Sequence, residues 1–168
     1  ADLSRRIVAD HDVHVLTVCG PREEDLARQI DKLADHPRVH SLADHPVSIG
    51  PLKACVRRGR MMITTDTGPR HFAAAFDVPQ IVLCGPIDPR WAAHRHPRET
   101  ILMQEIACRP CDKRYCPPGH QRCMKDLTVD RVYAAVAGEL NKDGELNREK
   151  VPGSVQIERN MGAPHART

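Results

Sequence analysis

The feature that most limits the fold of this chain is a repeated alternation of short apolar strands and helical segments. Three apolar runs, at 13–19, 61–65 and 80–84, are each followed within a few residues by a Gly-Pro pair. The segments between the runs place apolar residues at helical spacing, and the connections are short. Such alternation is typical of an α/β fold, in which a doubly wound parallel sheet is covered by helices.

Helical spacing also predicts where the individual helices lie. We expect helices over 23–33, 49–58, 69–76 and 128–140, and weaker strands at 39–42 and 100–103. In the first of these helices, Leu26, Ile30 and Leu33 share one face, which should pack on the core. Thr128 is the predicted N-cap of the last helix, because its hydroxyl can accept a hydrogen bond from an amide of the first turn.

The apolar pattern stops near Asn141, and the residues beyond it include three loop-forming clusters, at 142–144, 152–154 and 162–164, without periodic apolar residues. We therefore expect residues 1–140 to form one α/β domain that includes a cysteine-rich loop at 108–124. Residues 141–168 are predicted to form an extended or disordered tail, because they lack the apolar surface that would order them.

Composition narrows the class of protein. The net charge is +3, the basic residues are interspersed with acids, and aromatic residues make up only 3% of the chain. A surface that binds nucleic acid would need a basic patch, so no nucleic-acid partner is expected. No apolar run is long enough to cross a membrane, and the polar N-terminus is not typical of a signal peptide.

A polar cluster at the junction after the 61–65 strand is the strongest candidate for a ligand site. Its members are Asp66, Thr67, Gly68, Arg70 and His71. Backbone amides near Gly68 and Arg70 open a helix, where unpaired N–H groups favour an anion such as a diphosphate. The alternative is a plain strand-to-helix turn that Asp66 or Thr67 caps.

A second junction, at Gly20-Pro21, places Glu23 and Glu24 at a helix start. A carboxylate at this position can accept hydrogen bonds from a ribose, as acids do in other nucleotide sites. The alternative is that both glutamates only offset the helix dipole.

The seven cysteines fall into two groups. Three lie in apolar segments and are predicted to be inert core residues: Cys19, Cys55 and Cys84. Four are clustered, with His120 as a spare candidate ligand: Cys108, Cys111, Cys116 and Cys123. Four thiolates are able to form a tetrahedral zinc site, whereas paired disulfides or reduced thiols are the alternatives.

Together these segments resemble the ADP-heptose:lipopolysaccharide heptosyltransferases of glycosyltransferase family 9. The resemblance rests on Thr65-Asp66-Thr67-Gly68-Pro69-x-His71 with the alanines that follow, and on Cys84-Gly85-Pro86-x-Asp88-Pro89. The cysteine-rich segment 108–124 is similar to the heptosyltransferase II branch. The likeness covers about residues 1–140.

The resemblance implies a GT-B glycosyltransferase with two Rossmann-like domains, of which this chain matches the C-terminal, donor-binding half. It implies that Asp66, Thr67, Gly68 and His71 hold the ADP diphosphate and the heptose, and that Glu23 contacts the ribose. The reaction would be inverting transfer of heptose from ADP-heptose to the lipopolysaccharide core, without a metal. The enzyme would be cytoplasmic, at the inner face of the inner membrane.

Two departures from the family limit what this chain should do. The general base and most of the acceptor site belong to the N-terminal half of the family, and the phosphate-contacting lysine expected before the first strand is missing. We therefore assign no catalytic residue and expect the chain alone to bind ADP weakly and transfer nothing. The alternatives are a glycosyltransferase with another nucleotide-sugar donor, or a non-catalytic module that binds a nucleotide or a metal.

Overall fold

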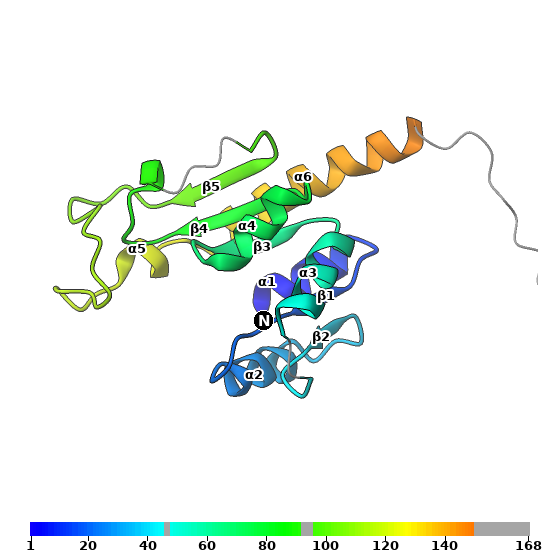
Figure 1. The fold of residues 1–168 in the computed structure, drawn as a ribbon, viewed down its shortest axis with the longest axis horizontal. Coiled ribbons are helices and arrows are strands. Elements are labelled where there is room, and N and C mark those ends of the chain that lie inside the picture. Colours follow the sequence, from blue (N-terminus) through cyan, green and yellow to red (C-terminus); the bar gives the residue numbers. More distant parts are fainter. Residues whose placement is uncertain (46–47, 92–95, 150–168) are drawn as a thin grey trace, which may run out of the picture.

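The computed structural model describes residues 1–45, 48–91 and 96–149, and these form an α/β fold with parallel sheets and flanking helices (Figure 1). One sheet pairs β1 (Val15–Thr17) with β2 (Val39–Ser41). The other has the order β3-β4-β5 and is built from Met62–Thr65, Gln80–Cys84 and Glu99–Met103. All neighbouring strands are parallel. The predicted α/β class is confirmed.

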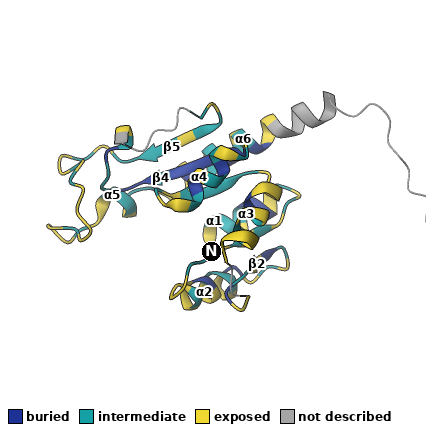
Figure 2. Cartoon of the chain, viewed as in Figure 1, coloured by how far each residue is buried: buried dark blue, intermediate teal, exposed yellow. Residues whose placement is uncertain are grey.

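Helices cover both faces of the three-stranded sheet. α6 (Val129–Glu149) packs against α1 (Asp2–Asp10), and its buried residues share a core cluster with Ile81 of β4. α3 (Ile49–Arg58) packs against α4 (Gly68–Ala75), and their cluster includes Met62 of β3. Because side chains alternate along a strand, these two clusters lie on opposite faces of the sheet. β4 is buried along almost its whole length, as Figure 2 shows.

The single sheet that the sequence pattern predicted is divided in two. Among the described residues, β1 forms strand pairs only with β2, and β3 only with β4. The core is nevertheless shared, because Val15 of β1 and Ile63 of β3 pack on the same apolar cluster. β1 has only three residues, so its ladder is short and the contact with β3 is made by side chains.

The prediction that the face with Leu26, Ile30 and Leu33 packs on the core is wrong. In α2 (Glu24–Ala34), Ala27 and Ala34 are buried, whereas Leu26 and Leu33 are 60% and 65% exposed. Ala34 packs in a cluster with Val8 and Val39, and the short alanine side chain lets α2 lie close to these neighbours.

The last helix begins as predicted and ends later. The amide of Arg131 donates to the hydroxyl of Thr128 at 3.3 Å, which is the expected N-cap bond. Val132, Val136 and Leu140 are buried. The helix then continues to Glu149, so the extended segment predicted from Asn141 does not begin there. Residues 141–149 contain several good helix formers, and the remainder of the predicted tail, 150–168, lies outside the described residues.

Two short helical segments complete the fold. The 3-10 turn η1 (Pro89–Trp91) follows β4, and α5 (Arg122–Lys125) lies in the cysteine-rich segment. The carboxyl ends of β3, β4 and β5 meet at one edge, since Thr65 is paired with Leu83 and Cys84 with Met103. This edge is where open parallel sheets bind ligands.

Candidate functional site

The turn between β3 and α4 presents an uncapped helix start. Thr67 occupies the N-cap position, but its side chain makes no cap hydrogen bond to α4. Its hydroxyl instead lies 3.3 Å from the Thr64 hydroxyl and 3.4 Å from the Thr65 carbonyl oxygen. Pro69 has no amide hydrogen, and the amide of Arg70 donates to the carbonyl oxygen of Thr67 at 3.2 Å. The amide of Gly68 is therefore the first-turn donor that the Thr67 side chain leaves without a cap bond. This arrangement suits an anionic ligand.

Gly68 opens α4 and faces open space. A Cβ added at this position would meet no heavy atom of the described chain within 4 Å. The packing of the protein therefore does not demand a glycine here. A close approach of a ligand to the backbone would demand one, because a methyl group would occupy the space of the ligand.

Asp66 and Arg70 point into the protein rather than toward solvent. The side chain of Arg70 is 2% exposed, and its guanidinium pairs with the carboxylate of Asp66 and, at 3.1 Å, with that of Glu99. Gln80 donates from Nε2 to Glu99 at 2.8 Å. This buried network ties the turn after β3 to the first residues of β4 and β5.

The predicted site residues thus separate into two groups. Thr67, Gly68 and His71 are exposed on the turn and the first turn of α4. Asp66 is half-buried, and Arg70 is buried beneath the turn. The structure brings all five together, but the side chain of Arg70 supports the turn from below.

Glu23 closes the junction between β1 and α2. It is the N-cap residue of α2, and its carboxylate accepts a hydrogen bond from the amide of Gly20 at 2.8 Å. Glu24 lies one residue further, in the first turn. A local structural role is thereby visible for Glu23, and its contact with a ribose stays a prediction.

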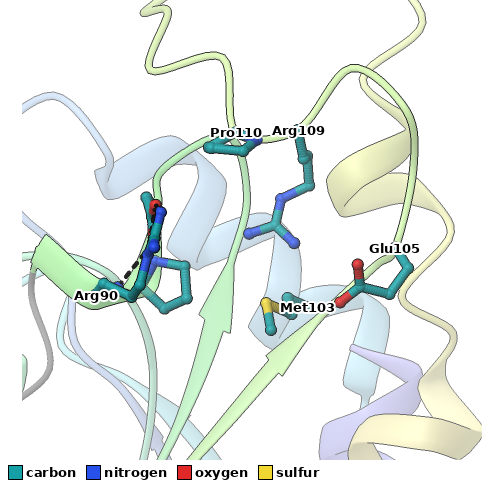
Figure 3. A pocket seen from close by; sticks show the side chains of 7 residues that line it. Arg90, Met103, Glu105, Arg109 and Pro110 are labelled. Atoms are coloured by element: carbon teal, nitrogen blue, oxygen red, sulfur yellow. Dashed lines mark hydrogen bonds and ion pairs between the residues drawn. The ribbon is translucent and has the colours of Figure 1, made fainter.

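A pocket of about 320 Å³ lies at the carboxyl ends of β4 and β5 (Figure 3). Its lining comes from the loop after β4 and the loop after β5: Asp88, Pro89, Arg90, Met103, Glu105, Arg109 and Pro110. Arg90 binds the carboxylate of Asp88 through Nε and Nη2, at 3.0 and 2.6 Å. Hydrogen bonds from the Arg90 side chain and backbone hold the pKa of the Asp88 carboxyl below its usual value.

Glu105 and Arg109 line the pocket but are not among the site residues predicted from the sequence. Both follow the 100–103 strand closely, and the carboxyl end of a strand in a parallel sheet is a favoured place for ligands. That position was the signal that would have pointed to them.

The four clustered cysteines do not converge. Sγ of Cys108 lies 3.9 Å from Nε2 of His120, whereas Sγ of Cys116 accepts from the amide of Gln121 at 3.3 Å. Across the part of the chain that the structure describes, no three Cys, His, Asp or Glu side chains are grouped as metal ligands. This arrangement does not fit a tetrahedral zinc site. Zinc stays a prediction, which elemental analysis of the purified chain would test.

All seven cysteines are free thiols, and the predicted core cysteines differ in burial. Cys84 is buried, and burial raises the pKa of its thiol. Cys19 and Cys55 are only partly buried, so the core prediction holds fully for Cys84 alone.

No helix within the described ranges, including the 21-residue α6, combines the length and hydropathy that a membrane crossing requires.

Comparison with known proteins gives matches over most of the chain. Residues 3–121 match the family model of glycosyltransferase family 9 (heptosyltransferase). The chain is 27% identical to lipooligosaccharide heptosyltransferase 2 of Campylobacter jejuni, over 81% of this chain and 43% of that protein. It is 33% identical to lipopolysaccharide heptosyltransferase 1 of Pseudomonas aeruginosa, over 83% of this chain and 35% of that protein.

Solved structures have the same fold. The structure of E. coli ADP-heptose lps heptosyltransferase II matches with a TM-score of 0.71 and 16% identity, over 85% of this chain and 40% of that one. A glycosyl transferase family 9 protein from Veillonella parvula matches with a TM-score of 0.68 and 17% identity, over 84% of this chain and 40% of that one. The chain therefore spans about two fifths of the length of these relatives.

Proposed function

Because this chain belongs to glycosyltransferase family 9, the heptosyltransferase family, we propose that it is the donor-binding half of a lipopolysaccharide heptosyltransferase. The donor would be ADP-heptose, and the acceptor a sugar of the lipopolysaccharide inner core. The observation that carries the proposal is the family match over residues 3–121, which includes the uncapped turn at β3–α4. The names of the two bacterial relatives support heptose transfer to lipopolysaccharide or lipooligosaccharide.

In this proposal the diphosphate of the donor lies against the start of α4. The amide of Gly68 donates to its oxygens, and the open space at this residue allows the backbone to approach. The Thr67 hydroxyl and the exposed His71 are close enough in sequence to contact the same group. As the bond between heptose and diphosphate breaks, negative charge grows on the leaving ADP, and these donors stabilise it.

Arg70 acts indirectly in this proposal. Its buried guanidinium is paired with two carboxylates, so it does not offer a free positive charge to the diphosphate. It holds Asp66, and with it the turn whose Gly68 amide binds the donor. Glu23 would contact the ribose from the neighbouring β1–α2 junction.

The proposed reaction inverts the anomeric carbon, with an acceptor hydroxyl attacking as ADP leaves. The base that removes the proton from this hydroxyl would lie in the other half of the enzyme, as would most of the acceptor site. No metal is needed for the step. The enzyme would work in the cytoplasm at the inner face of the inner membrane, where a lipid-anchored acceptor is accessible.

Nucleotide titration tests the donor assignment. We expect calorimetry to show weak binding of ADP to the chain, tighter than that of UDP or GDP, and a lower affinity in the His71→Ala variant. A matched change, His45→Ala in the exposed segment after β2, should leave the affinity unchanged. Tighter binding of UDP would favour another nucleotide-sugar donor, and equal ADP affinity in the wild type and the His71 variant would contradict this site.

A transfer assay tests whether the base and the acceptor site lie in the other half of the enzyme. The isolated chain, mixed with ADP-heptose and a core acceptor, should release no ADP above the background hydrolysis. Heptose transfer by this chain alone would contradict the proposal that the base and acceptor site lie elsewhere.

A further inference from the structure

Arg109 is a partly buried cation that contacts neutral acceptors, two carbonyl oxygens and the Sγ atom of Cys84 at 3.6 Å. Its Nη1 donates to the carbonyl oxygen of Gln104 and its Nη2 to that of Ile87, both at 3.1 Å. Its Nε is buried and has no hydrogen-bond acceptor in the described structure. Within that same part of the chain, no carboxylate lies within ion-pair distance of this guanidinium. A partly buried cation in this state is stabilised by an anion that binds beside it.

The guanidinium points into the pocket at the ends of β4 and β5, as Figure 3 shows. Asp88 is near enough for the charge of Arg109 to help lower the pKa of its carboxyl, but the direct ion pair of Asp88 is with Arg90. Asp88, whose side chain is 7% exposed, is neutralised by its two-point contact with Arg90. Glu105 is exposed on the opposite side, where its carboxylate can accept hydrogen bonds from hydroxyl groups.

The size of the pocket restricts its occupant to a small molecule. About 320 Å³ is near the lower limit of ligand pockets, and the lining includes only one long apolar side chain, Met103. A fixed guanidinium beside a carboxylate matches a small molecule that carries both an acidic group and hydroxyls. An apolar ligand would leave both charges without partners.

We propose that the Arg109 pocket binds the phosphate or carboxylate group of a hydroxylated substrate, with Arg109 pairing the anion and Glu105 facing the hydroxyls. The inference goes beyond the donor site at the start of α4, because it concerns a second set of residues on other loops. Two sources have this chemistry: the diphosphate of the donor, or an acidic group on the acceptor. The pocket and the β3–α4 turn both lie at the carboxyl ends of the three parallel strands, so either substrate is able to reach it.

Inorganic phosphate is the probe, because it has the required charge and no other recognition feature. The Nε–H of Arg109 is shielded from water, so its proton–nitrogen signal should be observable by NMR and serves as the reporter. We expect this signal to shift saturably as phosphate is titrated at constant ionic strength. The Arg109→Gln variant should weaken phosphate binding about tenfold or more. The Glu105→Gln variant should tighten it roughly twofold to fivefold, because a like charge is removed.

The matched control is Arg57→Gln, which removes the same charge at the exposed end of α3. This end of α3 leads into the start of β3, so Arg57 lies at the amino ends of the strands, away from the pocket. It should leave phosphate binding unchanged. Arg109 also connects two loops through carbonyl oxygens, so a second variant must leave those contacts intact. Arg90→Gln does so, and it should weaken phosphate binding because it exposes the charge of Asp88 to the pocket.

Each outcome of the phosphate titration either overturns the proposal or identifies the source of the anion. Equal phosphate affinity in the wild type and Arg109→Gln, or a shift that chloride reproduces, would overturn the proposal. Loss of phosphate binding after saturation with ADP would identify the donor diphosphate as the source, and retained binding would point to the acceptor. A chain that binds phosphate here but not ADP would keep this inference and reject the proposed donor site.

Discussion

Replacing Arg70 with methionine tests whether the buried ion pairs of this residue support the turn between β3 and α4. The change keeps a long side chain beneath α4 but removes the cation that joins Asp66 to Glu99. The side chain of Glu99 is 5% exposed and that of Asp66 is 16% exposed, so two carboxylates would remain in a poorly hydrated space. The variant therefore leaves uncompensated negative charge in the protein interior.

The size of the effect follows from this burial. Removal of one partner from a buried ion pair costs about 3–5 kcal/mol, because the remaining charge stays desolvated. For a chain of this length, that loss lowers the melting temperature by roughly 6–20 °C. Removing one of the two remaining charges should restore part of the stability, so Arg70→Met with Glu99→Gln should be more stable than Arg70→Met alone.

Urea unfolding followed by circular dichroism measures these differences. The control is Arg5→Met, which breaks an ion pair with Asp2 whose side chains are 53% and 71% exposed. An exposed pair contributes at most about 1 kcal/mol, so this variant should remain close to the wild type. If Arg70→Met costs no more than Arg5→Met, or if the double variant is the less stable, the network does not hold the turn as argued.

Three further results are expected. Gly68→Ala should leave the free energy of unfolding unchanged or raise it by up to about 1 kcal/mol, because the methyl group meets no protein atom. Calorimetry should show at least about tenfold weaker ADP binding by this variant, because the methyl group occupies the space of the ligand. Equal ADP affinity in the variant and the wild type would place the diphosphate elsewhere. Thr128→Ala should lower the free energy of unfolding in urea by about 1 kcal/mol through loss of the cap bond, and no change would mean that another group caps α6. Burial raises the pKa of the Cys84 thiol and so lowers the fraction of this residue that is thiolate. Mass spectrometry should therefore show slower alkylation of Cys84 than of the exposed Cys108 at pH 8. Equal alkylation rates would contradict this burial.

The strands and most helix limits were predictable because they depend on local chemistry. The strand at 80–84 has the predicted limits, since an apolar run lies between a proline and a Gly-Pro pair. The cap at Thr128 was predictable for the same reason. The buried face of α2 was not, because leucines mark one face and alanines another, and only the neighbours decide which face packs. The neighbours on the packed face are Val8 and Val39, which form a buried cluster with Ala34.

The sequence was sufficient to predict which residues form the candidate site, but not which way their side chains point. Asp66, Thr67, Gly68 and His71 lie together because they are consecutive at a strand-to-helix turn. The burial of Arg70 depends on Glu99, which is brought beneath it only when β5 pairs with β4. Arg109 is likewise oriented by carbonyl oxygens of two different loops, a contact that no local pattern encodes.

The interruption between β1 and β3 has a consequence for how the molecule opens. No backbone ladder in the described part of the chain connects the two sheets, so side-chain packing alone couples their fluctuations. Such units often exchange their amide hydrogens with separate opening free energies. We expect the amides of β4, which is bonded on both sides, to exchange slowest, and those of β1 and β2 to exchange faster as a group. The Glu23 junction then belongs to the more readily opened unit, and the β3–α4 turn at Gly68 to the more rigid one.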